Sequence, residues 1–288
     1  MDSQLVINQN VNLQNINRLF RLVILFAAGF LLTISRYTAI RQIYSLWRGS
    51  EDFDGLYLVP ILTFIVLWQR RKKLFSFQWK TFWTALIPLG IILIFQALKT
   101  PTGARMQMLL LIVSIELTIL TIFGLSAFRY VTAPLMLSIL AIPAPDWLWQ
   151  KMTLVTQYLS LKASIFVYSR VAPISCDGFW IFLHTCQKWV MVALQCSGVR
   201  SLLGLCIVSW FLFLRIRLNP IAILPLALCI PLIALSLNVC RILLTLTLRD
   251  HGLEKYTIEF WHGLAGIIVF FAGFFIVSRL AAIAEIKR

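Results

Sequence analysis

The chain has 288 residues, of which 60% are hydrophobic and only 13% are charged, and its formal net charge is +15. A soluble domain of this length is about half apolar and about a quarter charged, so the composition excludes an ordinary soluble protein. The basic residues flank apolar blocks and do not gather into one soluble arm or patch, which argues against nucleic-acid binding. We therefore expect a polytopic membrane protein whose surroundings are the lipid bilayer.

The apolar blocks are long enough to cross a bilayer, which takes about 20 residues, and they lack the alternation of a membrane barrel. We predict an all-α polytopic protein that forms one integral membrane domain over residues 1–288. Residues 1–18 are expected to form a cytoplasmic tail without a removable signal peptide, so the first span stays as an anchor. The eight predicted spans cover residues 19–35, 53–69, 81–98, 106–124, 131–149, 194–214, 220–245 and 260–280.

The distribution of lysine and arginine favours an orientation with both termini in the cytoplasm. The short loops on that side are dense in basic residues, most clearly at residues 70–73. The long segment 150–193 then lies outside the cytoplasm. We expect an interfacial helix over residues 150–172, followed by a small hairpin whose two β-prone runs enclose the polar turn 184–188 and lead into the sixth span.

Three polar residues lie at the outer ends of the last three spans. Cys196 opens the run Cys-Ser-Gly-Val-Arg-Ser, Arg241 ends Asn-Val-Cys-Arg, and His262 follows Trp261. A thiol at a helix start is favoured as a thiolate, and a guanidinium inside an apolar span is costly and needs a reason. An imidazole is the commonest general acid or base. The pattern predicts a nucleophile, a charge stabiliser and a proton carrier.

Four neighbouring residues are expected to contact a substrate. Arg200 lies four residues after Cys196, on the same helical face and one turn deeper. Asn238 shares the face of Arg241 and is placed to orient its guanidinium or to hold a substrate carbonyl. Ser197 adjoins the thiol, and Gly198 leaves room for a substrate backbone to approach.

Each of these residues also has a structural interpretation. A lone cysteine is more often a core residue than a nucleophile, Arg241 is also placed to pair with Glu116 or to reach the interface, and His262 is also read as an ordinary interface histidine. Cys206, Cys229 and Cys240 are expected to be inert core thiols. The sequence leaves open whether Cys176 and Cys186 form a disulfide. No cysteine or histidine cluster has zinc spacing, so we expect no metal and no cofactor.

Together, Cys-Ser-Gly-x-Arg-Ser, Asn-x-x-Arg-Ile and His-x-x-x-Gly on three successive outer helix ends resemble the exosortase/archaeosortase family of polytopic membrane enzymes, which are regarded as cysteine transpeptidases. Asp177-Gly178 and the aromatic-aliphatic run before the cysteine also look like the family. The resemblance is specific over residues 175–270. Upstream it rests on the number and arrangement of spans. The length is similar to that of compact bacterial exosortases, including cyanobacterial ones.

The resemblance implies that Cys196 is the nucleophile, Arg241 the catalytic arginine and His262 the catalytic histidine. It implies substrates that are exported proteins with a C-terminal PEP-CTERM-type sorting signal, made of a short Pro-Glu-Pro-type motif, one transmembrane helix and a basic tail. The acyl group would pass to a cell-envelope or exopolysaccharide acceptor. The enzyme would lie in the bacterial inner (plasma) membrane, with its active site facing the periplasm or exterior.

A second hypothesis is a non-enzymatic transporter or assembly factor for envelope polymers. Its intramembrane arginines would bind an anionic substrate or a lipid headgroup, and Cys196 would be incidental. A transporter's charged site belongs near the membrane midplane, whereas the three residues here are predicted near one surface.

Overall fold

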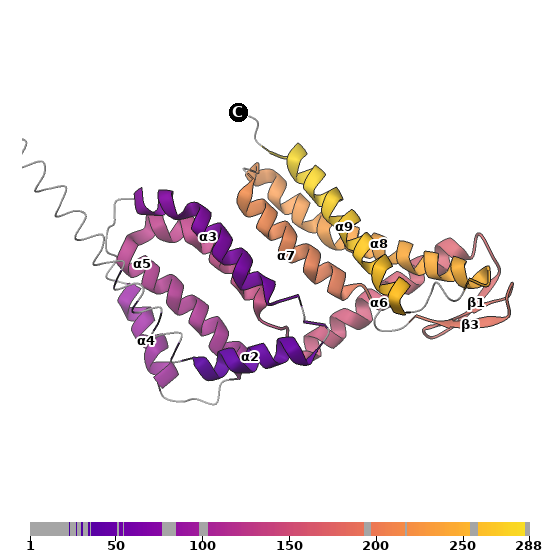
Figure 1. Ribbon diagram of the computed structural model, residues 1–288, viewed down its shortest axis with the longest axis horizontal. Coiled ribbons are helices and arrows are strands. Elements are labelled where there is room, and N and C mark those ends of the chain that lie inside the picture. Colours follow the sequence, from indigo (N-terminus) through magenta and orange to yellow (C-terminus); the bar gives the residue numbers. More distant parts are fainter. Residues whose placement is uncertain are drawn as a thin grey trace, which may run out of the picture. The chain divides into compact units, whose positions relative to one another are not determined.

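The structure is a computed structural model that describes residues 36–50, 52–53, 55–76, 85–97, 103–192, 197–216, 218–253 and 259–285, together with residues 23, 27, 30 and 34. It is mostly helical and divides into two compact units, Met1–Pro143 and Ala144–Arg288 (Figure 1). In the part of the chain described, three helices are long and apolar enough to cross a membrane: Ala104–Ala141, Ile221–Asp250 and Gly263–Ile283. The count of eight spans stays a prediction.

The N-terminal unit is built around one long helical run. Its elements are α2 (Tyr37–Gly49), α3 (Leu58–Ser76), α4 (Leu86–Ala97), α5 (Ala104–Leu137) and the 3₁₀ turn η2 (Ser138–Ala141). Helices α2, α3 and α4 all pack against α5 (Figure 1). Arg70 Nη1 donates to the Tyr130 carbonyl at 2.9 Å, and Ser138 Oγ donates to Thr63 Oγ1 at 3.2 Å. These two contacts set the end of α5 antiparallel to α3.

Helix α5 consists of two helical segments separated at Gly124, whose φ of 79° and ψ of −178° belong to a backbone region that is essentially restricted to glycine. The second segment corrects our expectation of one span over 131–149. The helix ends at Leu137, and a new helix, α6, starts at Asp146. Pro143 and Pro145 lie between them, and a proline supplies no backbone N–H to continue a helix.

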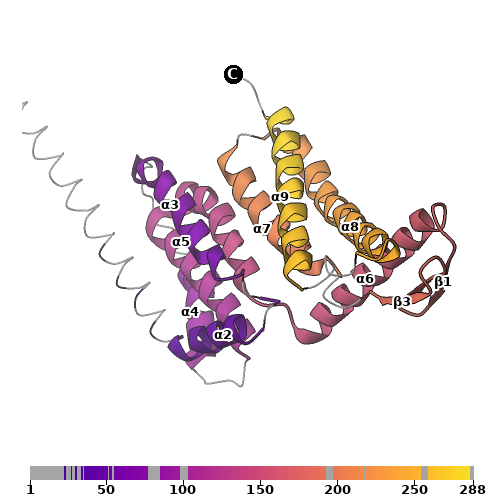
Figure 2. The same cartoon turned by 45° about the vertical axis from the view of Figure 1, so that its right-hand side comes forward.

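The C-terminal unit contains a helical group and a small sheet. Its elements are α6 (Asp146–Tyr168), β1 (Ile174–Asp177), β2 (Trp180–Leu183), β3 (Lys188–Met191), α7 (Val199–Arg215), α8 (Pro220–Asp250) and α9 (Glu259–Ile283). Figure 2 shows α7, α8 and α9 side by side, and α6 packs mainly against α8. Leu205, Ile230, Ala234 and Val277 fill the space between α7, α8 and α9. Helix α8 starts cleanly, because Asn219 Oδ1 accepts from the Ile221 N–H and Pro220 occupies the first helical position.

The three strands form an antiparallel meander in the order β1-β2-β3. The sequence predicted two strands about the turn 184–188; β2 and β3 occupy that region, and β1 is a third strand that was not expected. The sequence of β1, Ile-Ser-Cys-Asp, contains little that favours a strand. The placement of this sheet outside the cytoplasm stays a prediction. Cys176 and Cys186 are free thiols.

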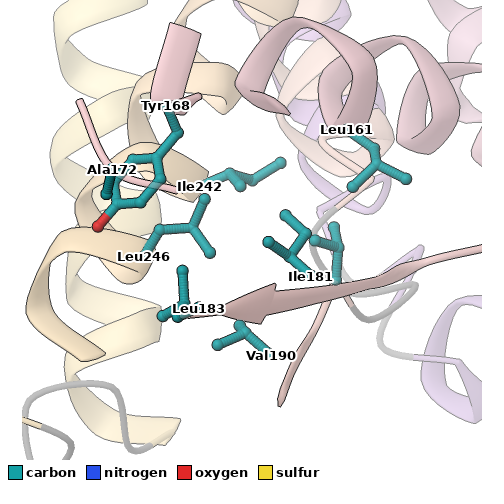
Figure 3. Close-up of a cluster of buried hydrophobic side chains, with 9 residues drawn as sticks. Leu161, Tyr168, Ala172, Ile181, Leu183, Val190, Ile242 and Leu246 are labelled. Atoms are coloured by element: carbon teal, nitrogen blue, oxygen red, sulfur yellow. The ribbon is translucent and has the colours of Figure 1, made fainter. Parts of the chain in front are cut away.

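One face of the sheet packs on helices α6 and α8. Figure 3 shows Ile181, Leu183 and Val190 pointing toward Ile242 and Leu246 of α8, with Leu161 and Tyr168 of α6 alongside. Ile181, Leu183 and Leu246 are fully buried. This apolar cluster fixes the sheet to the two helices that carry most of the polar residues of the candidate site.

Candidate active site

Three helices supply the residues that the sequence singled out. Helix α7 begins directly after Ser197 and Gly198, α8 carries Asn238 and Arg241, and His262 lies in the first turn of α9. Cys196 lies outside the described residues, and so does the side chain of His262. The geometry of the site is therefore built from Ser197, Gly198 and the two polar residues of α8.

The start of α7 packs directly on Asn238. Gly198 caps the helix in the left-handed region, with φ 79° and ψ 0°. A Cβ at this position would lie 2.7 Å from Cγ of Asn238, closer than real side chains tolerate. We expected the glycine to leave room for a substrate backbone, but the amide of Asn238 occupies that space. The glycine is required both by its backbone conformation and by this contact.

Asn238 is held by a residue of α6. Its Nδ2 donates to Ser160 Oγ at 2.9 Å, and the two residues are 3% and 0% exposed. An amide buried in an apolar helix group is costly unless it is hydrogen-bonded, so this contact fixes the side chain in one orientation. Helix α6 thus supports the residue on which α7 begins.

A second residue of α6 holds the end of the sheet. Gln157 Nε2 donates to the carbonyl oxygen of Val192 at 2.7 Å, and Gln157 is 1% exposed. Val192 follows β3 and lies four residues before Cys196. The hydrogen bond therefore fixes the point from which the chain leaves the sheet toward the predicted nucleophile.

Sequence reasoning missed Gln157 and Ser160. The available signal was the spacing of Gln157, Ser160 and Ser164, which places three polar residues on one face of a largely apolar helix. All three are buried, at 1% exposure or less. We had assigned this helix to the membrane interface, where polar residues face water and carry little information.

Arg241 lies one turn beyond Asn238 and is only 8% exposed. Helix α9 approaches it at Gly266, where a Cβ would lie 3.5 Å from Nη1. Gly266 is four residues after His262, so the first turns of α9 run beside the guanidinium. Asn238 and Arg241 lie on one turn of α8, and the starts of α7 and α9 therefore meet around them.

Arg241 also lines a pocket at the edge of the sheet. The pocket is small and open on one side, and its walls are Val190, Met191, Val192, Arg241, Ile242, Thr245 and Leu246. Apart from the guanidinium and one hydroxyl, these walls are apolar. The buried cation is thus reached from the side of β3.

The other predicted residues lie around this cluster. Arg200 is exposed in the first turn of α7, Cys206 and Cys229 are half-buried, and Cys240 is exposed on α8. Our expectation of a core position is wrong for Cys240, because the inward face of α8 here is set by Asn238, Arg241 and Ile242. Among the described residues, no group of three His, Cys, Asp or Glu side chains is placed to hold a metal ion.

The family model for transmembrane exosortases matches residues 47–278, which includes every residue discussed for this site. The chain belongs to the transmembrane exosortase family. Membership makes this exosortase a membrane protein of the sorting peptidase and transpeptidase class, whose members process exported proteins. The match covers parts of both compact units of the exosortase. No curated protein and no solved structure matches the chain.

Proposed function

We propose that this exosortase is a cysteine-dependent transpeptidase or protease of the bacterial inner membrane. It cleaves the C-terminal PEP-CTERM-type sorting signal of exported proteins and passes them to a cell-envelope or exopolysaccharide acceptor. The observation that carries the proposal is the packing of the α7 start and α9 against Asn238 and Arg241. Cys196 is two residues before Gly198, and His262 is one turn before Gly266.

The chemistry follows from these residue types. The thiolate of Cys196 attacks the carbonyl carbon of the scissile peptide, and the carbonyl oxygen takes up the negative charge. Arg241 or backbone N–H groups at the start of α7 stabilise that oxyanion. His262 gives a proton to the leaving amine, and a thioester to Cys196 remains. An amine or another nucleophile of the acceptor then attacks the thioester and releases the thiol.

Asn238 and Arg200 have supporting roles in this scheme. Asn238, fixed by Ser160, holds the start of α7 and lies one turn from Arg241, so it keeps the thiol-bearing segment at a set distance from the cation. Ser197, buried beside Cys196, belongs to the same packed segment. Arg200 is exposed, which suits a substrate contact with an acidic residue of the sorting signal.

The position of Arg241 along α8 supports an active site near one surface. It lies 21 residues after Pro220 in α8, which at 1.5 Å per residue is about 31 Å, close to the roughly 30 Å of a hydrocarbon core. Arg215 lies near the other end of that helix. A transporter site would be expected near the middle of α8. We place the active site on the periplasmic or exterior side, by the positive-inside rule.

The nucleophile is tested by substituting single cysteines in the full chain. We expect Cys196→Ala to abolish processing of a tagged exported protein that carries a C-terminal sorting signal, while the variant still inserts into the membrane. Cys206→Ala and Cys229→Ala are matched controls and should process the substrate. Processing by Cys196→Ala at the wild-type rate would exclude the cysteine mechanism.

A further inference from the structure

Strand β3 is an edge strand with outward-facing backbone groups. Among the described residues it pairs with β2 alone. The Val192 N–H donates to the Phe179 carbonyl at 3.0 Å, which makes residues 179 and 192 a hydrogen-bonded pair. Such pairs alternate along an antiparallel ladder, so Val190 and Lys188 also bond to β2. Trp189 and Met191 therefore direct their N–H and C=O groups to the free edge.

The free edge adjoins the pocket that contains Arg241. Val190, Met191 and Val192 form the strand side of this pocket, and a turn and a half of α8 forms the other. Along any β-strand, every second side chain points to the same face of the sheet. A strand added beside β3 would therefore send every second side chain toward the α8 side, where the pocket lies.

We propose that an extended segment of the substrate polypeptide adds to β3 as a fourth strand and enters the active site from there. The proposal rests on the proposed function and assigns its substrate-docking surface. A polypeptide is the matching occupant, because the edge offers main-chain donors and acceptors at strand spacing, which another extended main chain satisfies. The guanidinium at the pocket is complementary to the carbonyl oxygens of that chain, which carry partial negative charge.

The position of the edge relative to the nucleophile supports this route. Cys196 is four positions after Val192, a distance along the chain that reaches at most about 14 Å when fully extended. A peptide that pairs with Trp189 and Met191 is therefore within reach of the segment that carries the thiol. The edge is held ready by the Gln157 hydrogen bond to Val192 and by the buried sheet face, so docking does not have to order it.

Disulfide scanning tests the docking mode without requiring turnover. The full chain carries one cysteine at position 191 in a background without native cysteines, including Cys196→Ala. Single cysteines are moved along the tagged substrate around its cleavage site, and mild oxidation is applied in membranes. We expect cross-links at every second substrate position, because a paired strand alternates its faces. Cross-links without this periodicity, no cross-links, or cross-links only between two copies of the enzyme would overturn the proposal.

A pair of proline variants tests the same edge in the active enzyme. Met191→Pro removes an outward N–H and leaves the β2–β3 ladder intact. Cys176→Pro is the matched control, because the His184 N–H bonds to the Pro173 carbonyl and residue 176 therefore faces the opposite edge of the sheet. We expect Met191→Pro to raise KM about tenfold with a smaller change in kcat, and Cys176→Pro to leave KM within about twofold.

Equal KM values for the two proline variants would overturn the proposal. If Met191→Pro fails to accumulate, the cross-linking periodicity decides. A periodic pattern combined with normal processing by Cys196→Ala would reject the cysteine mechanism and keep the docking edge. Loss of processing in Cys196→Ala without periodic cross-links would keep the cysteine mechanism and reject the docking edge.

Discussion

At the scale of single residues, the candidate site is a set of polar side chains held inside apolar helices. Asn238 Nδ2 donates to Ser160 Oγ, and Gln157 Nε2 donates to the Val192 carbonyl. Each of these hydrogen bonds connects two elements that are distant in sequence. Polar groups in this environment are costly when unpaired, so the contacts restrict the elements to one arrangement. The site is therefore formed before a substrate arrives.

The two arginines near the nucleophile are expected to differ in role. Arg241 is buried beside Asn238 and α9, whereas Arg200 is exposed on α7. Arg241→Lys should lower turnover by at least about tenfold, or roughly 1.4 kcal/mol, because an ammonium does not reproduce the planar, multiple donors of a guanidinium. Arg200→Lys should be milder and act on KM. The measurement is the rate of tagged-substrate cleavage in membranes at several substrate levels. A wild-type rate for Arg241→Lys with an inactive Arg200→Lys would reverse the two roles.

Gly198 is predicted to be intolerant of any side chain. Gly198→Ala places a methyl group 2.7 Å from Cγ of Asn238 and in a left-handed conformation, and the backbone term alone costs about 1–3 kcal/mol. We expect cleavage to fall at least about tenfold, because relief of this clash displaces the start of α7 relative to Arg241. The control is Gly90→Ala in α4, where nothing lies within 4 Å of the new Cβ. Equal activity of the two variants would contradict the packing of α7 on Asn238.

At the scale of elements, one carboxylate ties α6, the β2–β3 turn and the end of α8 together. Tyr168 donates its hydroxyl to Asp250 Oδ2 at 3.0 Å, and Thr185 Oγ1 donates to Asp250 Oδ1. Burial, and then the hydrogen bond to Asp250, raise the pKa of Tyr168 to about 12. The neutral phenol is thus favoured in the folded state. The neutral phenol therefore stabilises the folded state fully below the ordinary tyrosine pKa of about 10. This stabilisation is lost as the pH rises through about 12.

Tyr168→Phe should loosen the sheet without touching the candidate site. Losing one hydrogen bond to a charged group costs about 1.5–3 kcal/mol, so the turn 184–187 should become more sensitive to limited proteolysis in detergent. Tyr158→Phe is the control, since Tyr158 is an exposed residue of the same helix. Raising the pH from about 10 toward 12 should increase cleavage of the wild type more than that of Tyr168→Phe. Identical cleavage of the two variants at neutral pH would contradict the role of this contact.

Several elements could be predicted from the sequence, and others could not, for physical reasons. The apolar blocks that give α8 and α9, and the start of α8 at Asn219-Pro220, follow from hydropathy and capping. The strand β1 was missed because it is stabilised by pairing with β2 and not by its own residues. Gln157 and Ser160 were missed because their importance depends on partners 35 and 78 residues away.

At the scale of the whole molecule, the basic loops predict which face of the membrane each segment meets. Lys72 is exposed in the last turns of α3, directly after Arg70 and Arg71. His184 is exposed in the turn that follows β2. By the positive-inside rule, the first should face the cytoplasm and the second the exterior. The candidate site, at the outer end of α8, would then face the exported substrates.

Thiol labelling of intact cells tests this orientation. In a background without native cysteines, which also removes Cys176 and Cys186, a cysteine at position 184 should react with a membrane-impermeant reagent. A cysteine at position 72 should react only after permeabilisation. Both positions are exposed, so accessibility to the reagent is matched. Labelling of position 72 in intact cells would place the candidate site in the cytoplasm.

The cluster beneath the sheet has a consequence for the order of events during synthesis. Its strand residues end at Val192, but Ile242 and Leu246, which cover them, are made about 50 residues later. At ribosomal rates of about 5–20 residues per second, the strands are made several seconds before the α8 residues that bury them. Helix α9, which completes the surroundings of Arg241, is made later still. A nascent exosortase therefore carries Cys196 for several seconds before α8 and α9 complete the surroundings of Arg241, and we expect no cleavage activity before that point.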